Sequence, residues 1–225
     1  MRSYPYAQLV GSLMYLAIAT RPDISYCVGL LGRFSSNPGL PHWKAAKHLL
    51  RYLKGTMDLK LVYAPDPSQT ELVVTYCDAD HGGDRDNKRS TSGMIVKMGT
   101  GAISWASRLQ TIATLSTTEA EFVSAVSAGQ EIVWLRNLLS ELGYTFPGPS
   151  TLFVDNQSAI AVANNPEHHG RMKHLDLRFY WLRDVVELGL IQVKHLRTDS
   201  MPADLLTKQL GRLKVNGLRQ LMGLQ

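Results

Sequence analysis

The stretch Leu72–Asp80, which reads LVVTYCDAD, decides how this chain folds. Its Val, Thr and Tyr residues favour the pleated, half-buried surface of a β-strand, and it ends in two acids, Asp78 and Asp80. A buried strand that runs into carboxylates is costly unless a cation or a hydrogen-bond donor meets them. The stretch therefore predicts a buried strand that ends at a functional site.

Three later segments also place an acid at the end of a predicted strand or at the start of a predicted helix. They are STTEAEF (Ser116–Phe122), LFVDNQSA (Leu152–Ala159) and MPADLLTK (Met201–Lys208). Hard divalent cations prefer oxygen ligands, and paired metal ions on carboxylates cleave phosphodiesters. Each acid alone is more typical of a helix cap or a solvated turn, but together with Asp78 the segments predict a metal-binding carboxylate cluster.

The residue pattern leaves open which acid of STTEAEF joins the cluster. Glu119 and Glu121 lie about 200° apart around a helix, so only one of them can face the sheet. The positions that follow each acid at helical spacing are similarly apolar, and periodicity therefore does not separate the two.

Composition excludes several classes of protein. The 225 residues suffice for one large domain or for one domain with an extension. No apolar run reaches the roughly 18–20 residues that span a bilayer, and residues 1–23 lack a signal-peptide pattern. The only cysteines, Cys27 and Cys77, form no CxxC pair, which indicates free thiols in a reducing compartment and excludes a thiolate zinc site.

The positive charge is concentrated near the N-terminus. Of the net charge of +5, residues 1–64 contribute eight Lys or Arg against two Asp or Glu, whereas residues 65–225 carry sixteen against seventeen. Such asymmetry favours a contact with nucleic acid, but a solvated helical face explains it equally well.

The pattern of elements predicts two units. Residues 1–56 read as three helical segments, residues 60–63 as a short strand, and a Pro-rich turn at 64–69 marks a boundary. The order after residue 70 is βββ-α-β-α-α-β-α, with a long helix over residues 117–142. We therefore predict a basic helical segment at 1–64, a mixed α/β domain at 65–212 and a C-terminal tail at 213–225.

Taken together, these motifs resemble the C-terminal part of the Pol polyprotein of copia-type LTR retrotransposons, over nearly the whole chain. Residues Tyr6–Gly29 and His42–Thr56 are similar to the segment that links the polymerase body to the ribonuclease H domain of that family. The segments similar to the ribonuclease H domain itself are CDAD with RSTSG (Arg89–Gly93), AISWASRLQ (Ala102–Gln110), STTEAEF, VDNQSAI, RMKHLDLR (Arg171–Arg178) and ADLLTK.

The resemblance implies a ribonuclease H-like fold, a five-stranded mixed sheet with flanking helices, and hydrolysis of the RNA strand of RNA/DNA hybrids. It places the catalytic and metal-binding acids at Asp78, Glu121, Asp155 and Asp204, with Asp80 as a neighbour. Two Mg²⁺ or Mn²⁺ ions are the implied cofactors, and cleavage would leave 5′-phosphate and 3′-hydroxyl ends. Hybrid specificity would come from 2′-hydroxyl contacts and backbone shape.

Further site and partner assignments concern basic residues. The nucleic-acid contacts expected are Lys88, Arg89, Lys173 and His174. His195 is the only histidine near the last acid; it is more typical of a packed strand residue than of an auxiliary catalytic group. A zinc site built from His168, His169, His174 and His195 is disfavoured, because no ligand pair with the usual spacing occurs. The expected partners are an RNA/DNA hybrid and the polymerase portion of the same polyprotein.

Other interpretations stay open. The fold could persist as a catalytically silent remnant or scaffold that binds nucleic acid without cleavage, or it could serve another nuclease or transposase. No Tyr-x-Asp-Asp motif occurs, so a polymerase site is missing from the sequence. We expect either a piece of a larger polyprotein or a truncated remnant that begins at Met1. The expected location is intracellular, in a cytoplasmic virus-like particle or the nucleus.

Overall fold

The computed structural model describes residues 4–67, 69–164 and 176–225. In chain order, the helices, 3₁₀ turns and strands are α1 (Tyr6–Ala19), η1 (Pro22–Ile24), α2 (Ser25–Gly32), α3 (Leu40–Lys54), β1 (Val74–Ala79), β2 (Thr91–Met98), β3 (Gly101–Leu109), α4 (Thr117–Glu141), β4 (Ser150–Val154), α5 (Gln157–Asn164), α6 (Asp176–Glu187), β5 (Ile191–His195), η4 (Thr198–Ser200), η5 (Pro202–Leu206) and α7 (Arg212–Leu221).

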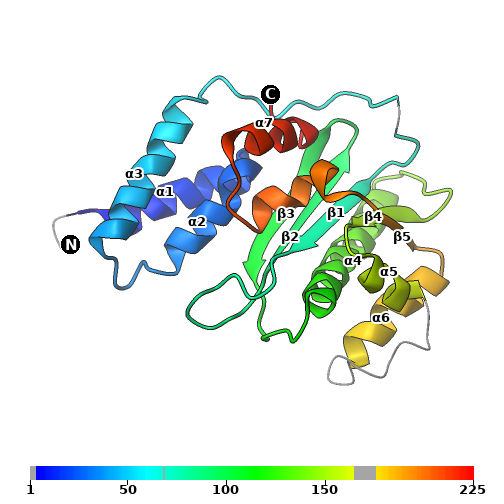
Figure 1. The fold of residues 1–225 in the computed structure, drawn as a ribbon. Coiled ribbons are helices and arrows are strands. Elements are labelled where there is room, and N and C mark those ends of the chain that lie inside the picture. The colour runs from blue at the N-terminus through cyan, green and yellow to red at the C-terminus, as the bar shows by residue number, and fades with distance from the viewer. Residues whose placement is uncertain (1–3, 68, 165–175) are drawn as a thin grey trace.

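The strands form one mixed sheet in the order β3-β2-β1-β4-β5. β1 pairs antiparallel with β2, which pairs antiparallel with β3, while β1–β4 and β4–β5 are parallel. The strand that the sequence singled out, β1, thus lies at the centre with a partner on each side (Figure 1). Because the ends of β1 and β4 point the same way, the residues that follow them meet at one edge of the sheet.

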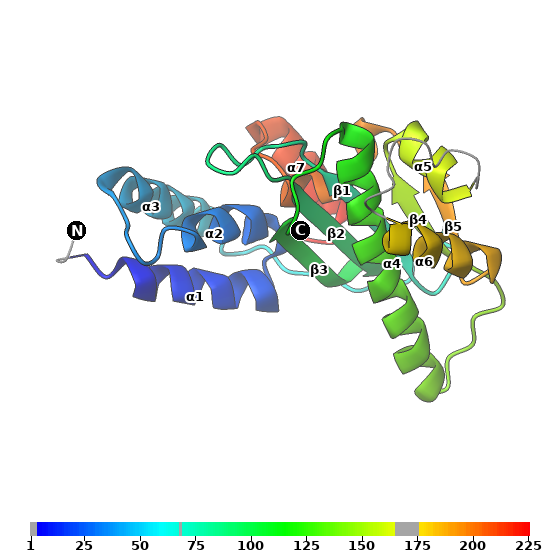
Figure 2. The same cartoon turned by 90° about the horizontal axis from the view of Figure 1, so that it is seen from below.

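Both faces of the sheet are covered. On β2, Ile95 joins an apolar cluster with Leu205, Leu206 and Leu218 of η5 and α7. Its neighbour Val96 belongs to a cluster with residues of α4. Successive residues of a strand point to opposite faces, so α4 packs on one face while η5 and α7 lie across the other (Figures 1 and 2).

The first three helices form a cluster of their own beside the sheet (Figure 1). α2 contacts β3 and η5. The indole Nε1 of Trp105 on β3 donates a hydrogen bond to the carbonyl oxygen of Ala17 at 2.7 Å. Arg33, just after α2, forms an ion pair with Asp84 in the loop between β1 and β2. These contacts dock the helical unit beside the edge of the sheet where β1 ends.

The observed fold confirms the predicted fold class, a five-stranded mixed sheet with flanking helices after an all-helical segment. It differs from the prediction at two places. The short strand expected near residues 60–63 is an isolated bridge between Leu61 and Leu224. The predicted C-terminal tail, residues 213–225, instead contains α7, whose Leu218 is buried with Met222 against the sheet. Within the described ranges, no helix is both long and apolar enough to cross a bilayer.

A glycine on β2 allows η5 to approach the sheet. Gly93 lies opposite Asp78 in the β1–β2 register. A Cβ atom at this position would lie 2.7 Å from Thr207 Cγ2, 2.8 Å from Leu206 Cβ and 2.9 Å from the carbonyl oxygen of Ala203. Real Cβ contacts are not this short, so η5 reaches its observed position only because residue 93 has no side chain.

We therefore expect Gly93→Ala to destabilise the protein by about 1–3 kcal/mol, the usual cost of overpacking. The free energy of unfolding is measured by urea denaturation. The matched control is Gly148→Ala in the loop before β4, where no atom lies within 4 Å of an added Cβ and a change of about 0.5 kcal/mol or less is expected. Equal effects of the two substitutions would contradict the proposed close approach of η5.

Candidate active site

Three of the predicted acids meet where β1, β4 and α4 come together. Asp78 is the fifth residue of β1, Asp155 directly follows β4, and Glu121 lies in the second turn of α4. One carboxylate oxygen from each lies within 4.8 Å of the others. Because β1 and β4 are parallel neighbours and α4 packs against β1, the convergence follows from the topology of the sheet.

The structure separates the two acids of the STTEAEF segment. Ser116 caps α4 by accepting a hydrogen bond from the Glu119 backbone at 3.2 Å, and the Glu119 carboxylate accepts one from the Leu115 backbone at 2.6 Å. This reciprocal arrangement satisfies donors at the start of the helix. Glu119 therefore belongs to the cap, and Glu121 is the acid that lies beside Asp78 and Asp155.

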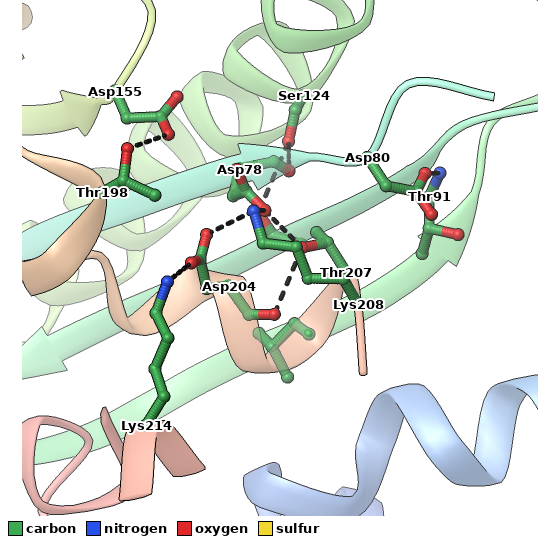
Figure 3. Close-up of polar contacts among 12 residues, drawn as sticks. Asp78, Asp80, Thr91, Ser124, Asp155, Thr198, Asp204, Thr207, Lys208 and Lys214 are labelled. Atoms are coloured by element: carbon green, nitrogen blue, oxygen red, sulfur yellow. Dashed lines mark hydrogen bonds and ion pairs between the residues drawn. The ribbon is translucent and has the colours of Figure 1, made fainter. Parts of the chain in front are cut away.

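Asp78 is held on several sides. Thr207 Oγ1 donates a hydrogen bond to its carboxylate, and Ser124 Oγ donates one to its backbone carbonyl oxygen at 2.8 Å (Figure 3). Lys208 Nζ lies 3.4 Å from the carboxylate. Burial raises the pKa of Asp78 to about 6, and the nearby Asp204 adds to this, although Lys208 and Thr207 pull it down.

Glu121 carries the largest electrostatic penalty of the cluster. Its side chain is buried, and Oε2 finds no hydrogen-bond partner within the described part of the chain. Burial, followed by the charges of Asp78 and Asp155, raises the pKa of Glu121 to about 10. A divalent cation would relieve both effects, because it supplies the missing partner and neutralises the crowded acids. The all-oxygen donor set fits a hard cation such as Mg²⁺ or Mn²⁺.

The fourth predicted acid, Asp204, lies outside the group of three but next to it. It belongs to η5 and is completely buried. Lys208 Nζ lies 2.8 Å from Asp204 Oδ1, and Lys214 Nζ on α7 lies 2.6 Å from Oδ2. Figure 3 shows the Lys208 ammonium group between Asp204 and Asp78. The structure therefore connects Asp204 to the cluster through a lysine.

The remaining predicted site residues lie around this centre. Asp80 turns to the backbone of Thr91, from which its carboxylate accepts a hydrogen bond. Lys88 and Arg89 are exposed in the loop between β1 and β2. His195 ends β5 opposite Val154; it is exposed, where the sequence favoured a packed side chain. The predictions for Lys173 and His174, and the disfavoured cluster with His168 and His169, fall outside the described residues.

Sequence reasoning missed the side chains that position the acids. Thr207 and Lys208 belong to the ADLLTK segment, and Ser124 lies three residues after Glu121 on the same helix, so local spacing could have indicated them. Thr198 donates a hydrogen bond to Asp155 at 3.1 Å from η4. Lys214 gave no such signal, because it lies in the segment predicted as a tail.

The chain is similar in sequence to several known proteins. It is 42% identical over all 225 residues to the retrovirus-related Pol polyprotein from transposon TNT 1-94 of Nicotiana tabacum, of which it spans 17%. It is 39% identical over 97% of its length to the corresponding polyprotein from transposon RE2 of Arabidopsis thaliana, of which it spans 15%. A secreted RxLR effector protein of Plasmopara viticola is 43% identical over 60% of this chain and 94% of its own length.

No protein-family model matches the chain. Among solved structures it is similar to LC11 ribonuclease H1 isolated from compost, with 15% sequence identity and a TM-score of 0.46. That similarity covers 61% of this chain and 94% of the compost protein.

The raised pKa of Glu121 has a consequence for stability. Between the ordinary pKa of about 4.5 in the unfolded chain and about 10 in the folded protein, the folded state binds more protons. The metal-free protein therefore loses stability as the pH rises through this interval. We expect Glu121→Gln to raise the free energy of unfolding of the metal-free protein at pH 8 by roughly 1–3 kcal/mol. At about pH 4 this increase should vanish.

The measurement is urea denaturation in EDTA at both pH values. Glu141→Gln, at the exposed end of the same helix, is the control and should change stability by no more than a few tenths of a kcal/mol. A gain from Glu121→Gln that is equal at both pH values would show that its ionisation does not oppose folding.

Proposed function

This chain belongs to the retrovirus-related Pol polyproteins of transposons, and from that membership we propose that it is a metal-dependent ribonuclease H. Its substrate would be an RNA/DNA hybrid formed during reverse transcription, of which it hydrolyses the RNA strand. The observation that carries the proposal is the convergence of Asp78, Glu121 and Asp155, with Asp204 beside them. Acids this close together and this buried repel one another unless a cation joins them.

We propose that Asp78, Glu121, Asp155 and Asp204 hold two Mg²⁺ or Mn²⁺ ions. When bound, such ions activate a water molecule as nucleophile and stabilise the leaving 3′ oxygen. The protein's own part is to position the carboxylates. Thr207 and Ser124 hold Asp78 in place, and Glu121, whose pKa burial raises to about 10, would release its proton to solvent where it serves as a ligand.

Access to the cluster suits a polymeric substrate. Asp155 is only partly buried, and Thr198, which binds it, is exposed. The exposed Lys88 and Arg89 follow β1 in the loop that begins just after Asp78 and Asp80, where they can meet a phosphate backbone. Lys173 and His174 are proposed to contact the nucleic acid, and the exposed His195 is proposed as an auxiliary group.

The polymerase portion of the same polyprotein is the proposed protein partner, in keeping with the family and with the small share of the polyproteins that this chain spans. We also propose an intracellular location, since reverse transcription by such an element takes place inside the cell. One observation favours the second candidate function, nucleic-acid binding without cleavage: both oxygens of Asp204 are already paired with lysines.

We expect the wild-type chain to cleave the RNA strand of an end-labelled RNA/DNA hybrid in the presence of Mg²⁺ or Mn²⁺. Asp78→Asn and Asp155→Asn should each lower the rate by at least about 100-fold, because each removes a proposed ligand. EDTA should abolish cleavage in the same way. Product analysis on a denaturing gel provides the measurement.

Asp184→Asn on the exposed face of α6 is the matched control and should cleave as the wild type does. Binding of the hybrid by a folded wild type that never cleaves it would favour the second candidate function. Cleavage that survives both Asp78→Asn and Asp155→Asn would exclude this cluster as the active site.

A further inference from the structure

From the contacts of Asp204 we infer that Lys208 and Lys214 occupy the place of a cation on this carboxylate, and that Asp204 becomes a metal ligand only after Lys214 withdraws. The inference rests on the proposed function and concerns how that site loads its second metal ion. It makes Lys214, on the C-terminal helix, a positioning residue that controls metal binding.

The acids of the site differ in the charges that surround them. Glu121 Oε2 has no hydrogen-bond partner within the described residues, so one oxygen of the group of three is ready for a cation. Asp204 Oδ1 likewise makes no hydrogen bond within the described residues, but it forms an ion pair with Lys208 Nζ at 2.8 Å, and Asp204 Oδ2 forms one with Lys214 Nζ at 2.6 Å. A buried carboxylate needs such compensation, and two lysines supply it where a divalent ion would otherwise do so.

At Asp204, the two lysines and a metal ion exclude one another. A carboxylate has enough lone pairs for several partners, but a divalent cation that binds Asp204 would lie a few ångströms from two ammonium groups. Like charges at that distance in a buried site repel strongly. Metal binding at Asp204 therefore requires at least one lysine to leave.

Lys214 is the lysine that can leave Asp204. Lys208 lies four residues after Asp204 on the same short segment and also reaches Asp78, so two carboxylates hold it. Among the ion pairs of the described residues, Lys214 contacts only Asp204, and its side chain is one-third exposed. It can turn to water while α7 stays in place, because Leu218 and Met222 remain buried against the sheet.

The simpler alternative is that the Lys214–Asp204 pair only anchors α7. In that case, removing the lysine would weaken folding and leave metal affinity unchanged. If Lys214 competes with the metal ion, its removal would strengthen binding of the second ion and leave binding of the first ion nearly unchanged. Metal affinity therefore distinguishes the two explanations.

The test is calorimetric titration of the full chain with Mn²⁺ in the absence of nucleic acid. The wild type should bind one ion more tightly and a second more weakly, and Asp204→Asn should remove the weaker step. Lys214→Met should tighten the weaker step by at least about tenfold. Lys214→Arg, which keeps the charge, should bind as the wild type does, and Lys47→Met on the exposed face of α3 is the matched control.

Circular dichroism and thermal unfolding establish that each variant is folded, and Lys214→Gln provides a second neutral variant if Lys214→Met does not fold. An unchanged weaker step in the folded neutral variants, or one that persists in Asp204→Asn, overturns the inference. If the wild type shows no tighter binding step, the proposed function is overturned instead, because that step depends on Asp78, Glu121 and Asp155.

Discussion

The mutual repulsion of buried carboxylates is the constraint on which the rest of this structure depends. Asp78, Glu121 and Asp155 place oxygens within 4.8 Å of one another, and two of the three side chains are almost completely buried. Such an arrangement opposes folding in the absence of a cation, as the raised pKa values of Asp78 and Glu121 indicate. The remaining structure has to hold the acids together against this repulsion, and it does so with a rigid sheet, a long helix and hydrogen bonds to Asp78.

The scaffold meets this demand through a small number of specific contacts. β1 is paired on both sides over Val74–Tyr76, and Asp78 near its end is still paired with Gly93 of β2. Gly93 lets η5 lie close enough to the sheet for Thr207 Oγ1 to donate a hydrogen bond to the Asp78 carboxylate. The cap formed by Ser116 and Glu119 fixes the start of α4, and with it the direction of Glu121. The mixed sheet and the helices that cover it thus provide positions for the acids, while a glycine and hydroxyl groups hold them in place.

Basic residues lie beside the acidic cluster and balance part of its negative charge. In the sequence, positive charge is concentrated in residues 1–64, and the structure docks these helices beside the loop that follows β1. Two further lysines, Lys208 and Lys214, lie directly against the acids and balance part of their charge. The C-terminal helix is joined both to the apolar face of the sheet and to Asp204, so packing and electrostatics at the site are connected through one element.

The sequence by itself determined the central strand, the order of the elements and the acids at their ends, because these depend on local pattern and on motifs that occur in order along the chain. It could not decide between Glu119 and Glu121 by periodicity, since both are followed by similar residues; the cap at Ser116 decides it by taking up Glu119. The sequence also predicted residues 213–225 as a tail. It did not reveal α7, because this helix is stabilised by packing against η5 and β2, and β2 is distant in sequence. The lysine contacts of Asp204 were therefore decided only by the tertiary structure, which brings together charges that no local pattern connects.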